Sequence, residues 1–371
     1  MLNNIFSQFE TTGTFHSALP FGSGHINDTY LAKTTEQHNP DYILRRINHK
    51  IFTTPHELMN NILLVTQHLR TKLSHNTNKN LTRECLTVIL NHQQEPIVID
   101  KEGNYWTCYL YIPDSNSHDI VKNPKQAYEG GRLIGRFLEM LSDFPAEKLH
   151  ETLPQFHNVE FRLDNFEHAL QEDAFNRAQH CQKEITYVRD LAEEMQLVIS
   201  LGKQGKIPLR VVHNDTKFNN LLLDNKDNGL CVIDLDTVMP GYVHYDFSDS
   251  VRTVANSCAE DEKELTKINF DMALFTAFCH GFLQECRENL TAEEINSLAR
   301  AVPLMPFLHG TRFLTDYLSG DSYYKIHFPE HNLQRAQAQF QLVRRMQEKT
   351  AEMNNIIQQI VSQPVLAVLD Y

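Results

Sequence analysis

The sequence lacks several features that would assign it to a familiar class of protein. Its 371 residues include only one tryptophan and seven cysteines, and the cysteines form no CxxC pair. No apolar run approaches the roughly 18 residues that a membrane span requires, and the first ten residues lack the basic and apolar segments of a signal peptide. The odd number of cysteines, several of them in apolar runs, indicates buried thiols in a reducing environment. We therefore expect a cytoplasmic protein without a membrane segment.

Positive charge is also scarce. The chain has 34 Lys and Arg residues against 47 Asp and Glu residues, which gives a formal net charge of −13. This balance disfavours a general nucleic-acid binder or a protein of anionic membrane surfaces. The 19 histidines are scattered without the spacing of a transition-metal site. With 41% apolar and 22% charged residues the composition is that of an ordinary globular protein, and the length predicts about two domains.

One stretch, residues 211–236, carries the densest chemical signal. It begins with two valines and contains Asp215 and, five residues later, Asn220. Two short apolar strands around a polar turn then place Asp234 at the end of the second strand. Phosphoryl transfer uses such a set of groups, because one carboxylate orients the attacking hydroxyl while an amide oxygen and a second carboxylate hold Mg²⁺. The stretch therefore predicts the catalytic centre of a kinase.

The same stretch reads HNDTKFNN at 213–220 and IDLD at 233–236. This pattern resembles the catalytic and metal-binding loops of the protein-kinase-like phosphotransferases. Because the sequence has no Asp-Phe-Gly triplet, it is closer to the aminoglycoside/choline kinase branch than to the protein kinases. The resemblance implies an α+β bilobal fold and the cofactors ATP and Mg²⁺. An ordinary hairpin with capped ends is the alternative, but it does not account for the combined spacing.

The resemblance assigns a role to each polar residue of the catalytic stretch. Asp215 is the expected catalytic base, or the group that orients the acceptor hydroxyl, and Lys217 is expected to reach the transferring phosphoryl group. Asn220 and Asp234 are the expected Mg²⁺ ligands. Asp236 either helps to bind a second ion or caps the turn that follows it.

Two other residues are expected to hold the catalytic loop in place. His213 would brace the loop by hydrogen bonds without a direct part in the reaction. Asp246, in the segment 245–249 that resembles the loop-bracing segment of this superfamily, would accept hydrogen bonds from the loop. Asp249 and Arg252 have the i, i+3 spacing of a helix ion pair.

Residues 1–115 alternate short β-like runs with one helix, near 55–72, in the order of a kinase N-lobe. Glycines in the turn at 21–29 would let backbone N–H groups approach the triphosphate, although an ordinary hairpin is the alternative for this turn. Neighbouring arginines stand where kinases place a lysine for the α- and β-phosphates, and successive strand residues face opposite sides of the sheet. The predicted nucleotide-binding residues are Gly22, Ser23, Gly24, His25, Asn27, Thr29, Arg45 or Arg46 and, at the hinge, Tyr111.

Residues 116–371 are expected to form the C-lobe, with the catalytic loop, the metal site and the acceptor site. Apolar residues recur there at three- to four-residue spacing, which indicates helices that each bury one face. The predicted helices are 124–141, 159–171, 184–201, 264–286, 292–301 and 333–361.

Several segments across nearly the whole chain together resemble one subgroup, the bacterial N-acetylhexosamine 1-kinases. One of them, RFLTDYLSGD at 312–321, lies outside any generic kinase motif. The resemblance implies ATP-dependent phosphorylation of the anomeric hydroxyl of N-acetylglucosamine or N-acetylgalactosamine, with Arg312, Asp316 and Tyr323 as sugar contacts. The alternative is that Arg312 and Asp316 form an i, i+4 helix pair and that Tyr323 is a packing residue.

Two other functions compete with the sugar kinase. One is a phosphotransferase for an aminoglycoside, choline or another sugar, and the other is a nucleotide-binding pseudokinase. The C-terminal third has no dedicated acidic cluster for a polycation, and the lone Trp106 gives little basis for an aromatic cage around choline. All the expected catalytic residues are present, which disfavours a pseudokinase. We expect a monomer or weak homodimer that binds a sugar and a nucleotide, and neither nucleic acid nor a membrane.

Overall fold

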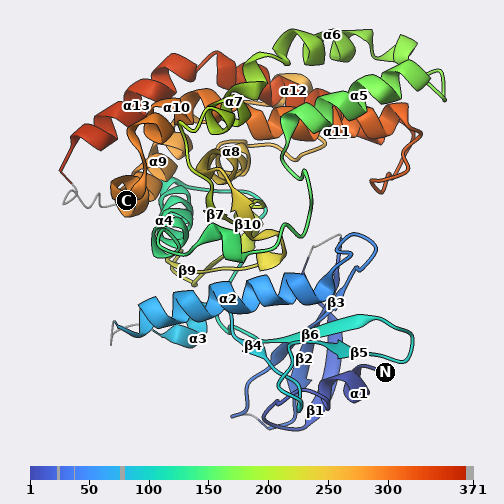
Figure 1. Cartoon of the computed structure of the whole chain (residues 1–371), viewed down its shortest axis with the longest axis vertical. Coiled ribbons are helices and arrows are strands. Elements are labelled where there is room, and N and C mark those ends of the chain that lie inside the picture. The colour runs from blue at the N-terminus through green and yellow to red at the C-terminus, as the bar shows by residue number, and fades with distance from the viewer. Residues whose placement is uncertain (23–25, 37, 76–79, 365–371) are drawn as a thin grey trace.

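The computed structural model describes residues 1–22, 26–36, 38–75 and 80–364, which form two lobes (Figure 1). The N-lobe contains an antiparallel sheet in the order β1-β2-β3-β6-β4, with β5 added to β6. The C-lobe is mostly helical, with two short hairpin-like sheets, β7–β10 and β8–β9. The predicted α+β class, with a β-rich N-lobe and a helical C-lobe, is confirmed.

The N-lobe sheet packs against one long helix, which lies between the sheet and the C-lobe in Figure 1. This helix begins at a proline, a residue that suits the first helical position because it has no N–H to leave unsatisfied. The N-lobe elements are α1 (Leu2–Phe6), β1 (Phe15–Pro20), β2 (Asp28–Thr34), β3 (Tyr42–Ile47), α2 (Pro55–Ser74), α3 (Leu81–Glu84), β4 (Val88–Ile89), β5 (Val98–Ile99) and β6 (Tyr105–Leu110).

The C-lobe builds its helices around the short strands that carry the predicted catalytic residues. Its strands are β7 (Arg210–Val212), β8 (Leu221–Leu223), β9 (Gly229–Val232) and β10 (Met239–Gly241). Its helices are α4 (Pro124–Met140), α5 (Val159–Glu172), α6 (Gln182–Leu191), α7 (Leu197–Lys203), α8 (Val243–Val254), α9 (Met272–Cys286), α10 (Ala292–Ala301), α11 (Leu304–Leu318), α12 (His331–Gln347) and α13 (Thr350–Ser362).

Some predicted helices differ from the structure. The helix expected at 184–201 is interrupted by a 3-10 turn between α6 and α7, and the helix expected at 333–361 is two helices, α12 and α13. The helix expected to begin at 264 begins at Met272, because the Asp271 side chain caps the N–H groups there. Helix α11 is absent from the predicted helices; its first turn contains Pro306 and its apolar residues extend around the helix. Proline is tolerated in the first turn, so it does not end this helix.

Helices α4 and α9 approach so closely that their contact requires glycine. A Cβ added to Gly131 of α4 would lie 2.1 Å from the carbonyl oxygen of Phe278 in α9, and one added to Gly281 of α9 would lie 2.0 Å from the carbonyl oxygen of Tyr128. The buried phenylalanines of α9 belong to the main core cluster of the C-lobe, which also contains Phe218 of the catalytic stretch. The position of the catalytic stretch therefore depends on the packing of these two helices.

We expect Gly131→Ala to destabilise the protein by about 1–3 kcal/mol or more, because the added methyl group can be accommodated only by moving backbone. Chemical denaturation monitored by circular dichroism measures this loss of unfolding free energy. A midpoint equal to that of the wild type would show that α4 and α9 can separate without cost.

The segment between the lobes is bonded first to one lobe and then to the other. The Tyr111 N–H donates to the carbonyl of Asp41 at 3.0 Å, so this end stays with the N-lobe sheet. Asn116 forms an antiparallel bridge with Leu223 of β8, with N–O distances of 2.8 and 2.9 Å. Between them, Arg83 of α3 donates to two backbone carbonyls, at 113 and 114.

Among the described residues, none of the helices combines the length and the apolar character that crossing a bilayer requires. All seven cysteines carry free thiols, and six of them are buried. Burial raises the pKa of the Cys85 thiol to about 12. A thiol with so high a pKa is a weak nucleophile at neutral pH, so we interpret the six buried cysteines as packing groups.

Candidate active site

The loop between β7 and β8 brings three of the predicted residues together. The Lys217 ammonium lies 2.9 Å from Oδ2 of Asp215. The Asn220 amide donates to the backbone carbonyl of Asp215 at 2.7 Å and to its Oδ2 at 3.0 Å. Although burial opposes the charge, Asp215 and then Asp234 raise the pKa of Lys217 above its ordinary value. The site therefore holds a fixed positive charge beside the carboxylate of Asp215.

Asp246, in the first turn of α8, holds this loop by hydrogen bonds to its backbone. Its two carboxylate oxygens accept the backbone N–H groups of His213 at 2.8 Å and of Asn214 at 2.7 Å. Burial raises the pKa of Asp246 to about 6, against the opposing effects of His213 and the two N–H groups. The predicted ion pair between Asp249 and Arg252 is present, at 2.8 Å, in the same helix.

The His213 side chain links the catalytic loop to the end of the hairpin. Its Nε2 lies 2.9 Å from the carbonyl oxygen of Ile233, and its Nδ1 accepts the N–H of Asp215 at 3.2 Å. A carbonyl oxygen can only accept, so the ring proton is on Nε2. One fully buried imidazole thus joins the residue before Asp234 to Asp215 itself.

A second buried histidine, which the sequence did not single out, supports the other side of the loop. His157 lies just before α5, and its Nε2 donates to the carbonyl oxygen of Asn214 at 2.7 Å. Asn214 has a φ of 64°, in the left-handed region that asparagine tolerates better than most residues. Burial lowers the pKa of His157 to about 3, so this ring is neutral at physiological pH.

We expect His157→Gln to change how stability depends on pH. The folded-state pKa of His157 is about 3 and its ordinary value is 6.5, so only the unfolded chain takes up a proton as the pH falls below 6.5. The wild type should therefore lose about 1.4 kcal/mol of unfolding free energy per pH unit from this group, and the variant should not. The stability difference between the two proteins should shift by about 2 kcal/mol between pH 7 and pH 5.

Urea unfolding at the two pH values measures this shift. His168→Gln, at an exposed position in α5, is the matched control and should retain the pH dependence of the wild type. A stability difference between His157→Gln and the wild type that does not change with pH would contradict the assignment of a buried neutral imidazole.

The end of the hairpin contacts the N-lobe, because Asp234 and Asp236 both pair with Arg45. Asp234 has a φ of 62°, and one of its oxygens pairs with Nη2 of Arg45. Nη1 of the same guanidinium lies 2.9 Å from Oδ1 of Asp236, whose other oxygen accepts from the Asn27 amide at 2.7 Å. Burial alone would raise the pKa of Asp234, but Arg45 and then Lys217 lower it below its ordinary value. Asp234 is therefore ionised at neutral pH.

The oxygen groups at this point suit a hard divalent cation. The carboxylate of Asp234 and the amide oxygen of Asn220 are donors of the kind that Mg²⁺ prefers. Within the described part of the chain, no three His, Cys, Asp or Glu side chains form a metal site. An ion held by these two residues would thus need further ligands, and phosphate oxygens and water usually supply them for Mg²⁺.

The structure separates the two arginines of β3. Arg46 pairs with Asp28 on the outer face of the sheet, so only Arg45 faces the catalytic carboxylates. Of the two alternatives, the register therefore favours Arg45, and the contact with phosphate stays a prediction. Thr29 lies opposite Arg45 in the β2–β3 ladder and shares its face.

The other predicted nucleotide residues lie around the start of β2 and the hinge. Gly22 is exposed, with a φ of 80°, and the neighbouring Phe21 ring contacts the Tyr111 ring edge-on, with 5.9 Å between centroids. Asn27 is buried and its side chain is used within the protein, since it also accepts from the N–H of Asn48 at 2.8 Å. The predicted residues Ser23, Gly24 and His25 lie outside the described residues.

The predicted acceptor residues are close together but do not act alike. The Arg312 guanidinium lies over the rings of Phe156, Tyr323 and Tyr324, at 5.6, 6.0 and 5.7 Å from their centroids. Tyr323 is 60% exposed, so its ring is available to a ligand.

The Asp316 carboxylate instead accepts the N–H groups of Tyr323 and Tyr324, each at 2.9 Å, and the Asn332 amide. These hydrogen bonds place Asp316 under the loop after α11. Direct contact of Asp316 with a sugar remains a prediction, and its geometry favours a positioning role.

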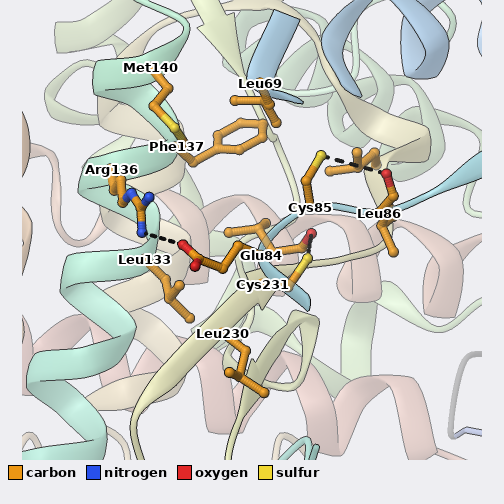
Figure 2. A pocket seen from close by; sticks show the side chains of 12 residues that line it. Leu69, Glu84, Cys85, Leu86, Leu133, Arg136, Phe137, Met140, Leu230 and Cys231 are labelled. Atoms are coloured by element: carbon orange, nitrogen blue, oxygen red, sulfur yellow. Dashed lines mark hydrogen bonds and ion pairs between the residues drawn. The ribbon is translucent and has the colours of Figure 1, made fainter. Parts of the chain in front are cut away.

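A small cavity lies next to strand β9, and none of the predicted site residues lines it (Figure 2). It is about 20 Å³ in volume and lies between α2 and α3 of the N-lobe and α4 and β9 of the C-lobe. Cys85 and Cys231 line it, and Arg136 pairs with Glu84 across it at 3.1 Å. This volume suffices for about one water molecule, so the cavity is too small for a nucleotide or a sugar.

Solved structures with the same fold are small-molecule kinases. A microcompartment-associated aminopropanol kinase is 16% identical, with a TM-score of 0.63 over 95% of this chain and 98% of that chain. An aminoglycoside phosphotransferase from Alicyclobacillus acidocaldarius is 13% identical, with a TM-score of 0.62 over 95% of each chain. An amicoumacin kinase in complex with AMP-PNP, Ca²⁺ and its ligand is 12% identical, with a TM-score of 0.55 over 99% of this chain and 94% of that chain.

At these identities the structural similarities establish the fold alone, which is protein-kinase-like. The sequence of residues 17–286 also matches the family model described as APH, phosphotransferase enzyme family. The matched residues include Arg45 of β3 and the whole catalytic hairpin. The chain is therefore a small-molecule phosphotransferase that belongs to the APH phosphotransferase enzyme family.

Proposed function

We propose that this protein transfers the γ-phosphoryl group of ATP to the anomeric hydroxyl of an N-acetylhexosamine and so forms the sugar 1-phosphate. The observation that carries the proposal is the convergence of Lys217 and Asn220 on the carboxylate of Asp215, next to a hairpin that ends at Asp234. Family membership supports transfer to a hydroxyl group. The choice of sugar rests on the resemblance of residues 312–321 and on the chemistry of the acceptor side.

In this proposal Asp215 accepts the hydrogen bond of the attacking hydroxyl and orients it, because positioning supplies most of the rate in a loose transition state. Lys217 lies beside it as a fixed positive charge for the transferring group. Arg45 faces the phosphates from β3. Mg²⁺, held by Asn220 and Asp234, would neutralise charge on the phosphates. The complex of amicoumacin kinase with AMP-PNP and Ca²⁺ supports a nucleotide and a divalent cation as cofactors.

The acceptor side favours a polyol over an amine. On the side of the catalytic loop that His157 contacts lies a charged group, the guanidinium of Arg312, with the aromatic rings of Phe156 and Tyr324 beside it. Guanidinium groups donate hydrogen bonds to hydroxyl and amide oxygens, but they repel ammonium groups. This charge disfavours an aminoglycoside, choline or an amino alcohol such as aminopropanol as the acceptor.

An ADP-release assay with a panel of acceptors tests the proposal. The panel contains N-acetylglucosamine, N-acetylgalactosamine, glucose, an aminoglycoside, choline and aminopropanol, each with ATP and Mg²⁺. We expect turnover with one or both N-acetylhexosamines, and a product whose phosphate is released by mild acid, as for a glycosyl phosphate. Turnover confined to an amine or to a sugar without the acetamido group would overturn the choice of acceptor.

A further inference from the structure

Two arginines of the C-lobe meet at one residue beside the catalytic loop. Arg162 of α5 donates from Nη2 to the carbonyl oxygen of Phe156 at 2.9 Å, and the Arg312 guanidinium of α11 lies over the Phe156 ring. Helices α5 and α11 lie side by side in the upper part of Figure 1 and pack together. Two guanidinium groups from different helices thus contact the same residue, Phe156.

This pair is connected directly to the catalytic loop. The rings of Phe156 and His157 lie 4.2 Å apart, and His157 donates to Asn214, the residue before Asp215. These contacts reach Asp215 from the helices of the C-lobe, whereas Arg45 contacts the hairpin from the N-lobe. The two arginines therefore lie on the acceptor side of Asp215.

Neither arginine has a carboxylate partner among the residues that the structure describes. Several other C-lobe arginines have such a partner, among them Arg177, Arg189 and Arg252 at 2.5, 2.7 and 2.8 Å from their acidic partners. Arg162 also keeps a buried Nε without any hydrogen-bond partner in the described part of the protein, and the nearby Tyr324 hydroxyl is in the same state. These groups are donors that the described fold leaves unused.

The charges of this pair are not independent. Burial and then the Arg312 guanidinium lower the pKa of Arg162 to about 10. Holding two like charges together without a counter-ion costs free energy, and so does burying a donor without an acceptor. An arrangement that costs stability in this way is typical of a binding site whose ligand supplies the missing charge.

We infer that Arg162 and Arg312 form a subsite for an anionic group on the acceptor, so that the substrate is an acidic N-acetylhexosamine that carries a carboxylate or phosphate substituent. The inference rests on the proposed function for the reacting hydroxyl and extends it to a charge on the same molecule. Two guanidinium groups can bind a carboxylate or a phosphate through paired hydrogen bonds. Half-buried side chains at this position are still open to a ligand, since Arg162 and Arg312 are neither fully buried nor fully exposed.

The test compares neutral and acidic forms of one sugar. The acceptors are N-acetylglucosamine, its 6-phosphate, its C6 carboxylate (the uronic acid) and its 3-O-carboxyethyl ether, so the arms separate phosphate from carboxylate and one attachment point from another. We expect at least one acidic acceptor to have a kcat/KM about 10- to 100-fold above that of the neutral sugar, the range that charged hydrogen bonds provide. A neutral sugar that equals or exceeds every acidic acceptor would overturn the inference.

Arg162→Gln identifies the group responsible. It should lower the ratio of kcat/KM for the preferred acidic acceptor to that for the neutral sugar by about 10-fold or more, and Arg162→Lys should restore part of it. Arg189→Gln, which breaks an exposed ion pair between α5 and α6, is the matched control and should leave the ratio unchanged. An unchanged ratio in Arg162→Gln would overturn the assignment.

The proposed function and this inference fail in different ways. If no N-acetylhexosamine is phosphorylated, the proposed function is wrong, and the subsite is then judged by calorimetric titration of the same acidic sugars into the wild type and Arg162→Gln. Binding that depends on Arg162 would support the anionic subsite by itself. The absence of any binding by the acidic sugars would overturn it.

Discussion

Asp215→Asn should lower kcat by about 100- to 10,000-fold, the range by which one positioned acid–base group accelerates a reaction. The amide keeps the size of the side chain and can still contact Asn220, but it cannot take a proton from the attacking hydroxyl. The KM for ATP should change little, because Asp215 lies with the acceptor and the nucleotide phosphates are expected to contact the side of the site that Asp234 and Arg45 form. Initial-rate kinetics with both substrates varied would separate the two constants.

The control for this experiment is another aspartate changed in the same way. Asp190→Asn, at an exposed position in α6, should leave kcat within about two-fold, because surface substitutions away from special features have small effects. Nucleotide binding by the Asp215 variant, measured by calorimetry, checks that its fold is intact. Turnover equal to that of the wild type would show that another group orients the acceptor, and it would reopen the pseudokinase hypothesis if the wild type were equally slow.

Asp234→Asn should lower kcat/KM for the Mg²⁺–nucleotide complex by about 100- to 1,000-fold. The variant removes one partner of a half-buried charge pair with Arg45. It also removes the carboxylate that we expect to bind the cation. Part of the loss should be recovered at high Mg²⁺ concentration, because the remaining oxygen ligands can still bind the ion weakly.

Asp236→Asn is the matched comparison, since its carboxylate faces the same arginine and also accepts from Asn27. If Asp236 mainly positions Arg45, this variant should lower kcat/KM for the Mg²⁺–nucleotide complex by about ten-fold or less. It should not change the Mg²⁺ concentration that the enzyme requires. A larger Mg²⁺ shift for Asp236→Asn than for Asp234→Asn would exchange the roles of the two residues. Thermal unfolding of both variants checks that the kinetic losses do not come from unfolding.

The parts of the fold that the sequence predicted best are those with local signals. The helix 292–301 is predicted with the observed bounds, since its apolar spacing lies within the element itself. Helix α11 was missed because the apolar residues around it obscure the periodicity and the proline in its first turn suggests a break. Such a helix is recognised only through its neighbours in three dimensions.

The same distinction applies to the candidate site. The spacing from Asp215 to Asp234 lies within one hairpin, so local sequence was enough to predict that these residues converge. Which arginine of β3 faces them depends on how the sheet packs against the C-lobe, and alternation alone could not decide it. Arg162 and His157 belong to a region without any motif, and their connection to Asp215 is made by tertiary contacts. No signal in a single sequence would have identified them.

The segment between the lobes changes its backbone partners within a few residues. Its backbone is bonded to N-lobe groups as far as residue 114 and to the hairpin of the catalytic loop from Asn116 onward. The change from one lobe to the other therefore takes place at Ser115, whose hydroxyl donates to the carbonyl of Ile112, next to Asp114 with its φ of 49°. Leu58 of α2 lies in the same core cluster as Phe137 of α4, and Arg45 pairs with Asp234 across the same boundary, so any separation of the lobes would first have to break these contacts.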